Sequence, residues 1–210
     1  TVGRTLRDLG LSCQRPLYRA WEQSPGLVQA WLDEEFPKIR EEAKQLKAQV
    51  FFGDEAGLRS DFHAGTTWGK KGKTPIVSST GKRHSLNMIS AISPRGDLRF
   101  MVVKGGVGAK VFIGFLKRLL QGAARPIFLI LDRHPAHVAK LTKAFVESTK
   151  GKLRIFFLPP YSPELNPDEY VWNNLKASVG RKMTTHAEEM KGRVISHLRS
   201  LQKNPEKVRS

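Results

Sequence analysis

The segment Ile127-Phe128-Leu129-Ile130-Leu131-Asp132 places five apolar residues directly before an acid. A short apolar run of this kind is typical of a strand that is buried on both faces of a sheet. The carboxylate of Asp132 then lies at the edge of the core, where a buried charge is unfavourable without a cation nearby. We therefore expect a central strand at residues 127–131 that ends in a functional acid.

Two further acids stand in comparable settings. Asp54 follows the apolar run Val50-Phe51-Phe52-Gly53, which predicts a strand at residues 50–54 that ends at this acid. Glu169 follows a proline-rich stretch, where Asn166-Pro167 is expected to cap a helix and place the acid in its first turn. Taken alone, an acid there is equally well an ordinary first-turn residue.

Three acids that converge from separate elements suit a pair of divalent metal ions. Mg²⁺ takes oxygen ligands and is usually held by carboxylates together with a substrate phosphate. A pair of such ions serves phosphodiester chemistry. The pattern therefore predicts that Asp54, Asp132 and Glu169 are catalytic residues that hold two Mg²⁺ or Mn²⁺ ions. Asp168 is the alternative to Glu169 as the third ligand, whereas Glu164 is assigned to the turn without a role.

Positive charge surrounds these acids. Residues 51–210 contain 28 Lys and Arg against 12 Asp and Glu, whereas residues 1–50 contain 8 against 7. A cationic surface around an acidic pocket fits a polyanionic substrate such as nucleic acid. A merely basic, ribosomal-type protein is the plainer interpretation of the charge alone.

The length and the cysteine content narrow the class of protein. A chain of 210 residues is long enough to bury a full core. Cys13 is the only cysteine, which excludes a disulfide within the chain and a cysteine-rich zinc site. No stretch is apolar enough to predict a membrane span. We expect a cytoplasmic protein, associated with the nucleoid if it is bacterial.

The remaining pattern predicts a mixed sheet with helices on both faces. Strands are expected at residues 50–54, 85–93, 98–104, 127–131 and 153–158, and helices at residues 108–121, 135–148, 167–179 and 187–201. Pro94-Arg95-Gly96-Asp97 is the turn between the second and third strands. Three antiparallel strands followed by two strands that alternate with helices indicate a ribonuclease H-like fold.

Residues 1–48 precede this sheet. Thr1 to Gly10 has the pattern of the last turns of a helix, and Gly10 ends it. Ser24-Pro25 predicts a helix to about residue 35, and Pro37 a second one to about residue 48. The alternating charges of this second helix favour a solvated face over a binding surface. We interpret residues 21–48 as a pair of linker helices.

One block of the sequence resembles a known family. It reads Leu158-Pro159-Pro160-Tyr161-Ser162-Pro163-Glu164-Leu165-Asn166-Pro167-Asp168-Glu169-Tyr170-Val171-Trp172. With Asp54 and Asp132, it resembles the catalytic domain of mariner-superfamily DDE transposases, in particular their bacterial insertion-sequence relatives. The resemblance covers about residues 48–200, and residues 1–20 resemble the end of the family's second helix-turn-helix module, in a chain that we expect to be truncated at its N-terminus.

The resemblance implies a function and a division of the chain. Residues 1–20 would end a DNA-binding module, residues 21–48 would link it, and residues 49–210 would form the catalytic domain. That domain would cleave DNA at transposon ends and join the 3′-hydroxyl to target DNA, as a homodimer on double-stranded DNA. In the family the third catalytic acid follows Asn-Pro closely, which corresponds to Glu169. Two alternatives remain: an inactive remnant that only binds DNA, and a metal-dependent nuclease of the same fold.

Six further residues are predicted to contact DNA. His134 and His137 start a helix after Asp132, and two histidines at this spacing also suit zinc, although no cysteine supports such a site. His137 is expected either to support a metal ligand or to contact a phosphate, and His134 to contact DNA or to cap the helix. Arg133, between Asp132 and His134, is predicted to contact DNA.

The other predicted contacts lie in the loop at residues 66–75. There Lys70, Lys71 and Lys73 alternate with glycines beside Trp68, which suits the close approach of a phosphate backbone. The plainer alternative is a solvated loop with Trp68 packed on the sheet. Trp172 is expected in the core.

Overall fold

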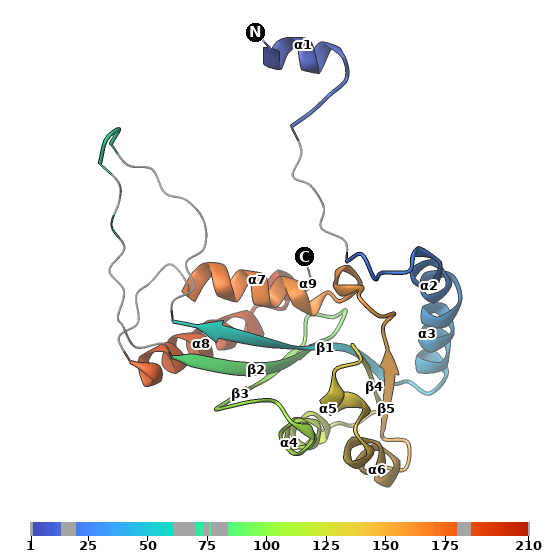
Figure 1. Ribbon diagram of the computed structural model, residues 1–210. Helices are drawn as coiled ribbons and strands as arrows, with labels where there is room; N and C mark the ends of the chain where they lie inside the picture. Colours follow the sequence, from blue (N-terminus) through green and yellow to red (C-terminus); the bar gives the residue numbers. More distant parts are fainter. Residues whose placement is uncertain are drawn as a thin grey trace.

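The computed structural model describes residues 2–13, 20–60, 70–73, 76, 84–179 and 186–209. Five strands form one sheet in the order β3-β2-β1-β4-β5 (Figure 1). Their bounds are β1 (Gln49–Arg59), β2 (Ser85–Ile92), β3 (Leu98–Val103), β4 (Ile127–Leu131) and β5 (Leu153–Phe157). β1, β2 and β3 pair antiparallel, whereas β4 pairs parallel with both β1 and β5. This is the mixed five-stranded sheet that we predict for a ribonuclease H-like fold.

Helices cover both faces of the sheet (Figure 1). One face carries α4 (Ala109–Leu120), α5 (Pro135–Val138) and α6 (Lys140–Ser148), and the other carries α3 (Phe36–Gln45), α7 (Asp168–Val179) and α8 (Ala187–Gln202). The short helices are α1 (Val2–Asp8), α2 (Pro25–Ala30), the π-helical turn η1 (Trp31–Glu35), the 3₁₀ turn η2 (Pro163–Leu165) and α9 (Pro205–Arg209). Among the described residues, no helix combines the length and apolar composition that a membrane span needs.

The core explains why β4 reads as an unbroken apolar run. All five of its residues are buried, because successive side chains point to opposite faces and helices cover both faces. Leu129 packs in the cluster beneath α4, whereas Phe128 and Ile130 pack in the cluster beneath α7 and α8. Trp172 of α7 is 1% exposed, which confirms its predicted place in the core.

Two predicted boundaries are wrong. β1 continues beyond Asp54 to Arg59, because residues 54–59 keep pairing with β2 after the pairing with β4 has stopped at Phe52. Asp54 therefore lies within the strand, at the level where β4 ends. The predicted helix at residues 135–148 is broken at Ala139, whose backbone is extended, into α5 and α6.

The helical segment before the sheet also differs from the prediction. Instead of two helices, residues 25–45 form one continuous helical run with a π-helical turn in the middle. The N–H of Phe36 donates to the carbonyl of Trp31, five residues back, directly before Pro37, which has no N–H to donate. Trp31 stacks on Phe36 and, with Ile39, joins the core cluster under α7 and α8. This segment is therefore packed against the sheet domain.

Gly53 shows how closely β1 is packed beside the site. A Cβ at this position would lie 2.8 Å from Cδ2 of Leu131 and 3.1 Å from the carbonyl oxygen of Ser90. We expect Gly53→Ala to lower the free energy of unfolding by about 1–3 kcal/mol, because the added methyl overpacks the core. Denaturant unfolding measures this. Gly192→Ala in α8 is the matched control: its Cβ meets no atom within 4 Å, so the variant should be slightly stabilised. A Gly53→Ala variant as stable as the parent would contradict this packing.

Candidate active site

Asp54 and Asp132 are brought together by the parallel pairing of β1 with β4. The last pair of that ladder is Phe52 with Ile130, so both acids lie two residues beyond it, on neighbouring strands. Asp54 is half-buried, whereas Asp132 is the first residue after β4 and is more exposed. The carboxyl ends of parallel strands meet at one edge of a sheet, and this is where α/β proteins place their sites.

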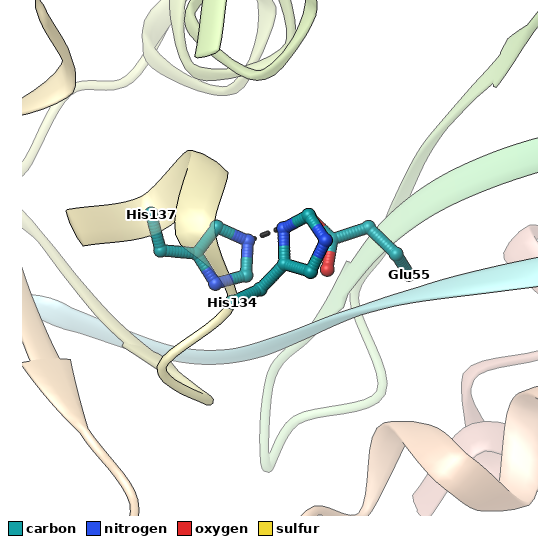
Figure 2. Close-up of side chains that lie close together, drawn as sticks. All are labelled: Glu55, His134 and His137. Atoms are coloured by element: carbon teal, nitrogen blue, oxygen red, sulfur yellow. Dashed lines mark hydrogen bonds and ion pairs between the residues drawn. The ribbon is translucent and has the colours of Figure 1, made fainter. Parts of the chain in front are cut away.

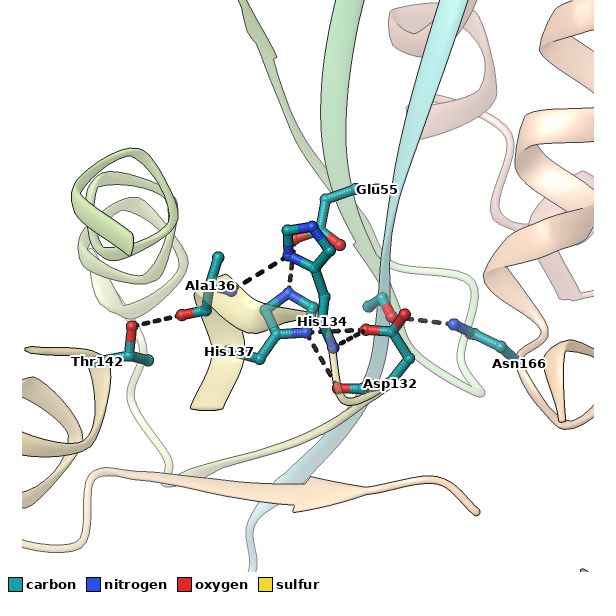
Figure 3. A network of polar contacts seen from close by, with 8 residues as sticks. Glu55, Asp132, His134, Ala136, His137, Thr142 and Asn166 are labelled. Atoms are coloured by element: carbon teal, nitrogen blue, oxygen red, sulfur yellow. Dashed lines mark hydrogen bonds and ion pairs between the residues drawn. The ribbon is translucent and has the colours of Figure 1, made fainter. Parts of the chain in front are cut away.

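Glu169 reaches the same place because α7 is anchored on β1. The side chain of Asn166 accepts a hydrogen bond from the N–H of Asp168 at 3.1 Å, which caps the helix as the sequence predicts. Its amide nitrogen also donates to the carbonyl of Gly53 at 3.0 Å (Figure 3). One buried amide therefore fixes the start of α7 directly beside Asp54.

All three predicted acids line one cavity of about 420 Å³. The proline-rich segment after β5 forms its other wall, and the complete lining is Asp54, Asp132, Arg133, His134, Leu158, Pro159, Pro160, Tyr161, Ser162, Pro163, Asn166 and Glu169. Gln23 supports this wall by donating to the carbonyl of Tyr161 at 3.1 Å. Glu164 does not line the cavity; it is exposed and accepts a hydrogen bond from Gln23.

The electrostatics of this cavity favour a bound cation. Burial, followed by the nearby charge of Glu169, raises the pKa of Asp54 to about 7, and the carboxylates of Glu55 and Asp132 act in the same direction. The donor atoms that the acids offer are all oxygens, which suits a hard divalent ion such as Mg²⁺ or Mn²⁺. The residues present therefore fit a metal site of the predicted kind.

Asp168, the alternative third ligand, points elsewhere. It is fully buried and accepts a hydrogen bond from Oγ of Ser90 in β2 at 2.6 Å, and it does not line the cavity. Burial raises its pKa well above the usual value, and the charges of Asp54 and Glu169 add to this effect against the opposing hydrogen bond from Ser90. Asp168 therefore ties α7 to β2, and Glu169 is the acid of this pair that faces the cavity.

His137 lies between two carboxylates. Its Nε2 is 2.6 Å from Oε1 of Glu55, and its Nδ1 is 2.9 Å from Oδ1 of Asp132 (Figure 3). Burial alone would lower its pKa, but the hydrogen bonds with Asp132 and Glu55 outweigh it and raise the pKa to about 9. A protonated imidazole explains this arrangement, because each of its two N–H groups donates a hydrogen bond to one carboxylate.

The buried position of His137 argues against its predicted contact with DNA. Its side chain is fully buried, and both ring nitrogens are occupied by carboxylates. Its place agrees with the other predicted role, support of a metal ligand. Partial burial alone would raise the pKa of Asp132. Hydrogen bonds from His137 and from the N–H of His134 outweigh this effect and hold the pKa of Asp132 below its usual value.

Glu55 is the functional residue that the sequence analysis missed. It directly follows Asp54 in the sequence, and nothing in its spacing shows that it would meet a histidine 82 positions later. Figure 2 shows Glu55, His134 and His137 pointing toward one another, with donor atoms within 4.8 Å of each other. Nε2 of His137 and Oε1 of Glu55 are already joined by a direct hydrogen bond in which the imidazole donates, so the group is a hydrogen-bonded network.

Arg133 and His134 lie at the wall of the cavity. His134 caps α5, since its Nδ1 accepts the N–H of Ala136 at 3.3 Å (Figure 3). The carbonyl of Ala136 in turn accepts from Oγ1 of Thr142 at 2.7 Å, which joins α5 to α6. Arg133 is exposed, and Cζ of its guanidinium lies over the ring of Phe157, 5.1 Å from the ring centroid. Both residues are placed beside the acids, where the predicted DNA contacts need them.

The predicted lysine loop falls mostly outside the described residues. Lys70, Lys71 and Lys73 are described and are exposed, whereas residues 61–69, 74–75 and 77–83 are not described. The predicted contact of this loop with DNA remains a prediction.

A protein-family model described as DDE superfamily endonuclease matches residues 49–191, which is more than half of the chain. The chain belongs to the DDE superfamily endonuclease family. The matched range contains Asp54, Asp132 and Glu169. A second model, described as winged helix-turn helix, matches residues 1–35.

A curated relative of the chain agrees with the resemblance seen in the sequence. The insertion element IS630 uncharacterized 39 kDa protein of Shigella sonnei is 26% identical over 153 residues, which are 71% of this chain and 44% of the relative. The chain thus spans less than half the length of that relative. The predicted DDE family is confirmed by the family model, and the match to an insertion-element protein agrees with the predicted insertion-sequence resemblance.

Solved structures show the same fold. The catalytic domain of Mos1 mariner transposase matches with a TM-score of 0.59 at 14% identity, over 91% of this chain and 94% of that chain. The Mos1 transposase paired-end complex with left transposon end matches with a TM-score of 0.66 at 14% identity, over 99% of this chain and 68% of that chain. The Mos1 mariner paired-end complex with Mn matches with a TM-score of 0.68, also at 14% identity, over 99% and 68%. At this identity the likeness concerns the fold.

Proposed function

We propose that this chain is the catalytic part of a DNA transposase. It cleaves DNA at transposon ends and joins the resulting 3′-hydroxyl to target DNA. The observation that carries the proposal is the cavity lined by Asp54, Asp132 and Glu169, three carboxylates from two strands and a helix. The family match and the fold shared with Mos1 transposase support the same reaction.

In this proposal Asp54, Asp132 and Glu169 hold two Mg²⁺ or Mn²⁺ ions. When bound, such ions activate a water or 3′-hydroxyl nucleophile and stabilise the leaving oxygen. Mos1 complexes with Mn and with Mg support the choice of metal. His137 orients Asp132 through Nδ1 and is itself held by Glu55 through Nε2. Arg133 and His134 contact the phosphates that flank the cut bond.

The proposed organisation has three parts. Residues 1–20 end a helix-turn-helix module, supported by the family match at residues 1–35, residues 21–48 are a linker, and residues 49–210 form the catalytic domain. The partners are double-stranded DNA and a second copy of the chain on that DNA. A protein with this substrate belongs in the cytoplasm, with the nucleoid if it is bacterial.

A strand-transfer assay with Mg²⁺ separates this function from the two alternatives. A labelled duplex with a candidate transposon end is incubated with an unlabelled target duplex, and products are resolved by size. The transposase gives both a cleaved strand and a longer joined strand. Cleavage without joining would identify a nuclease of the same fold, and neither product in Mg²⁺ or Mn²⁺ would identify an inactive remnant.

Divalent metal should also stabilise the protein. Without a cation the three carboxylates repel one another, and a bound metal ion removes this repulsion. A ligand present at ten times its Kd adds about 1.4 kcal/mol to the free energy of unfolding. We expect millimolar Mg²⁺ or Mn²⁺ to raise the Tm by about 3–6 °C. The control is Glu164→Gln, which should keep the shift, while Asp54→Asn should lose most of it. If neither Mg²⁺ nor Mn²⁺ raises the Tm of the parent, the metal site is degenerate.

A further inference from the structure

Basic side chains gather at the end of the sheet opposite to the catalytic cavity. Three of them lie on one side of α3 and just after its C-terminal end. These are Arg40, Lys44 and Lys47, which are spaced four and three residues apart and so form one stripe on a single helix face. All three are exposed. The acids of this helix lie off the stripe: Glu42 forms an ion pair with Arg154, and Glu41 accepts a hydrogen bond from Gln45 at 3.3 Å. Basic and acidic residues alternate along the sequence of this segment, but in the structure they lie on different sides of the helix.

Three arginines continue this surface onto the sheet. Arg95 lies in the turn between β2 and β3, Arg99 lies in β3, and Arg125 precedes β4; all are exposed. Arg95 and Arg125 line two neighbouring hollows, of about 370 Å³ and 250 Å³. The first hollow also has the α3 stripe in its lining, and the second also has Arg99. We call these six residues the far basic surface.

Little negative charge balances the far basic surface. Among the residues that the structure describes, none of its six cations forms an ion pair with a carboxylate. Asp97 lines a third, smaller hollow beside Arg95 and Arg125. Its carboxylate accepts a hydrogen bond from Oγ of Ser93 at 2.7 Å. Six exposed like charges around shared hollows repel one another, so an anionic partner would relieve this repulsion.

The far basic surface is separate from the catalytic cavity. β4 connects the two, with Arg125 before its first residue and Asp132 after its last. At about 3.3 Å per residue, the strand sets them roughly 20 Å apart. None of the six cations lines the catalytic cavity.

We infer that the far basic surface binds the phosphate backbone of a DNA duplex segment remote from the bond that is cut. This inference rests on the proposed function, in that DNA is the substrate class. Four of the six cations are arginines, whose planar guanidinium binds phosphate oxygens in pairs. The contacts are to phosphates, so the surface adds affinity and orientation without reading sequence.

The test compares the salt dependence of duplex binding among three charge-matched variants of the full chain. The first variant carries Arg95→Gln, Arg99→Gln and Arg125→Gln, and the second carries Arg40→Gln, Lys44→Gln and Lys47→Gln. The control carries Lys110→Gln, Lys140→Gln and Lys143→Gln, three exposed lysines of α4 and α6 outside the hollows. Binding of a non-specific duplex is measured from 50 to 200 mM salt, and cleavage in Mg²⁺ is measured at saturating duplex.

Each surface variant should lose about 2.7 units from the slope of log K against log salt, at about 0.9 per phosphate contact, so that the fall in affinity over this range shrinks about fortyfold. The control should keep both the parent slope and the parent rate of cleavage at saturating duplex. Parent slopes in both surface variants, or an equal loss in the control, would overturn the inference and would indicate instead a surface for an acidic protein or for none. Failure of the parent to cleave would contradict the proposed function and leave the slope comparison valid.

Discussion

Replacing Asp54 or Asp132 by Asn, or Glu169 by Gln, is expected to abolish Mg²⁺-dependent DNA cleavage while the fold persists. Each change removes the charge that holds a metal ion but almost no volume, and the chemistry depends on the ions for both the nucleophile and the leaving group. We expect a loss of at least about a thousandfold, comparable to the removal of one main electrostatic contributor from an active site. Rates of cleavage of a labelled duplex measure it, and unchanged circular dichroism shows that the variants fold.

Two neighbouring acids serve as matched controls. Glu164→Gln removes an exposed carboxylate from the same segment outside the cavity, and should cleave at the parent rate. Asp168→Asn keeps the volume of a buried residue that ties α7 to β2, and should retain far more activity than Glu169→Gln. Retained cleavage in Asp132→Asn would contradict the mechanism. The reverse order of the variants at positions 168 and 169 would make Asp168 the third ligand.

Binding of duplex DNA should fall by at least about a thousandfold between 50 and 200 mM salt. The net charge of the chain is +17, and its excess lies almost entirely in residues 51–210, so affinity should come mainly from the release of counterions. About six phosphate contacts give a fall of this size, and the further contacts proposed above make it steeper. Fluorescence anisotropy with a labelled duplex at several salt concentrations measures it.

The loop lysines test part of this prediction. Charge reversal at Lys70, Lys71 and Lys73 together should flatten the salt slope if these residues contact DNA. The same titration with a scrambled duplex should give nearly the same affinity as with a candidate terminal repeat, since phosphate contacts carry no sequence information. A strong preference for the repeat would show that this chain reads sequence itself.

The sequence predicts the sheet and its three acids because these depend on local pattern. The apolar run of β4 is continuous because both of its faces are covered, and the side-chain cap of Asn166 places Glu169 in the first turn of α7 through a local hydrogen bond. The block around these residues is also specific enough to indicate the family. Such signals lie within a few residues of one another and need no knowledge of the tertiary fold.

The features that were missed depend on contacts between distant segments. β1 runs past Asp54 because β2 continues to pair with it, and no property of residues 55–59 alone predicts this. The contact of Glu55 with His137 forms only when β1 and α5 meet. The charges of α3 look evenly mixed in the sequence, yet Arg40 and Lys44 face the turn at Arg95 once the helix packs on the sheet.

Anomalous diffraction from crystals of the protein bound to DNA and soaked in Mn²⁺ tests the central claim most directly. The account predicts two anomalous peaks in the cavity, with ligand oxygens from Asp54, Asp132 and Glu169 and with Asp168 still bonded to Ser90. Peaks at Glu55, His134 and His137 in place of the cavity, or no peak at the three acids, would contradict it.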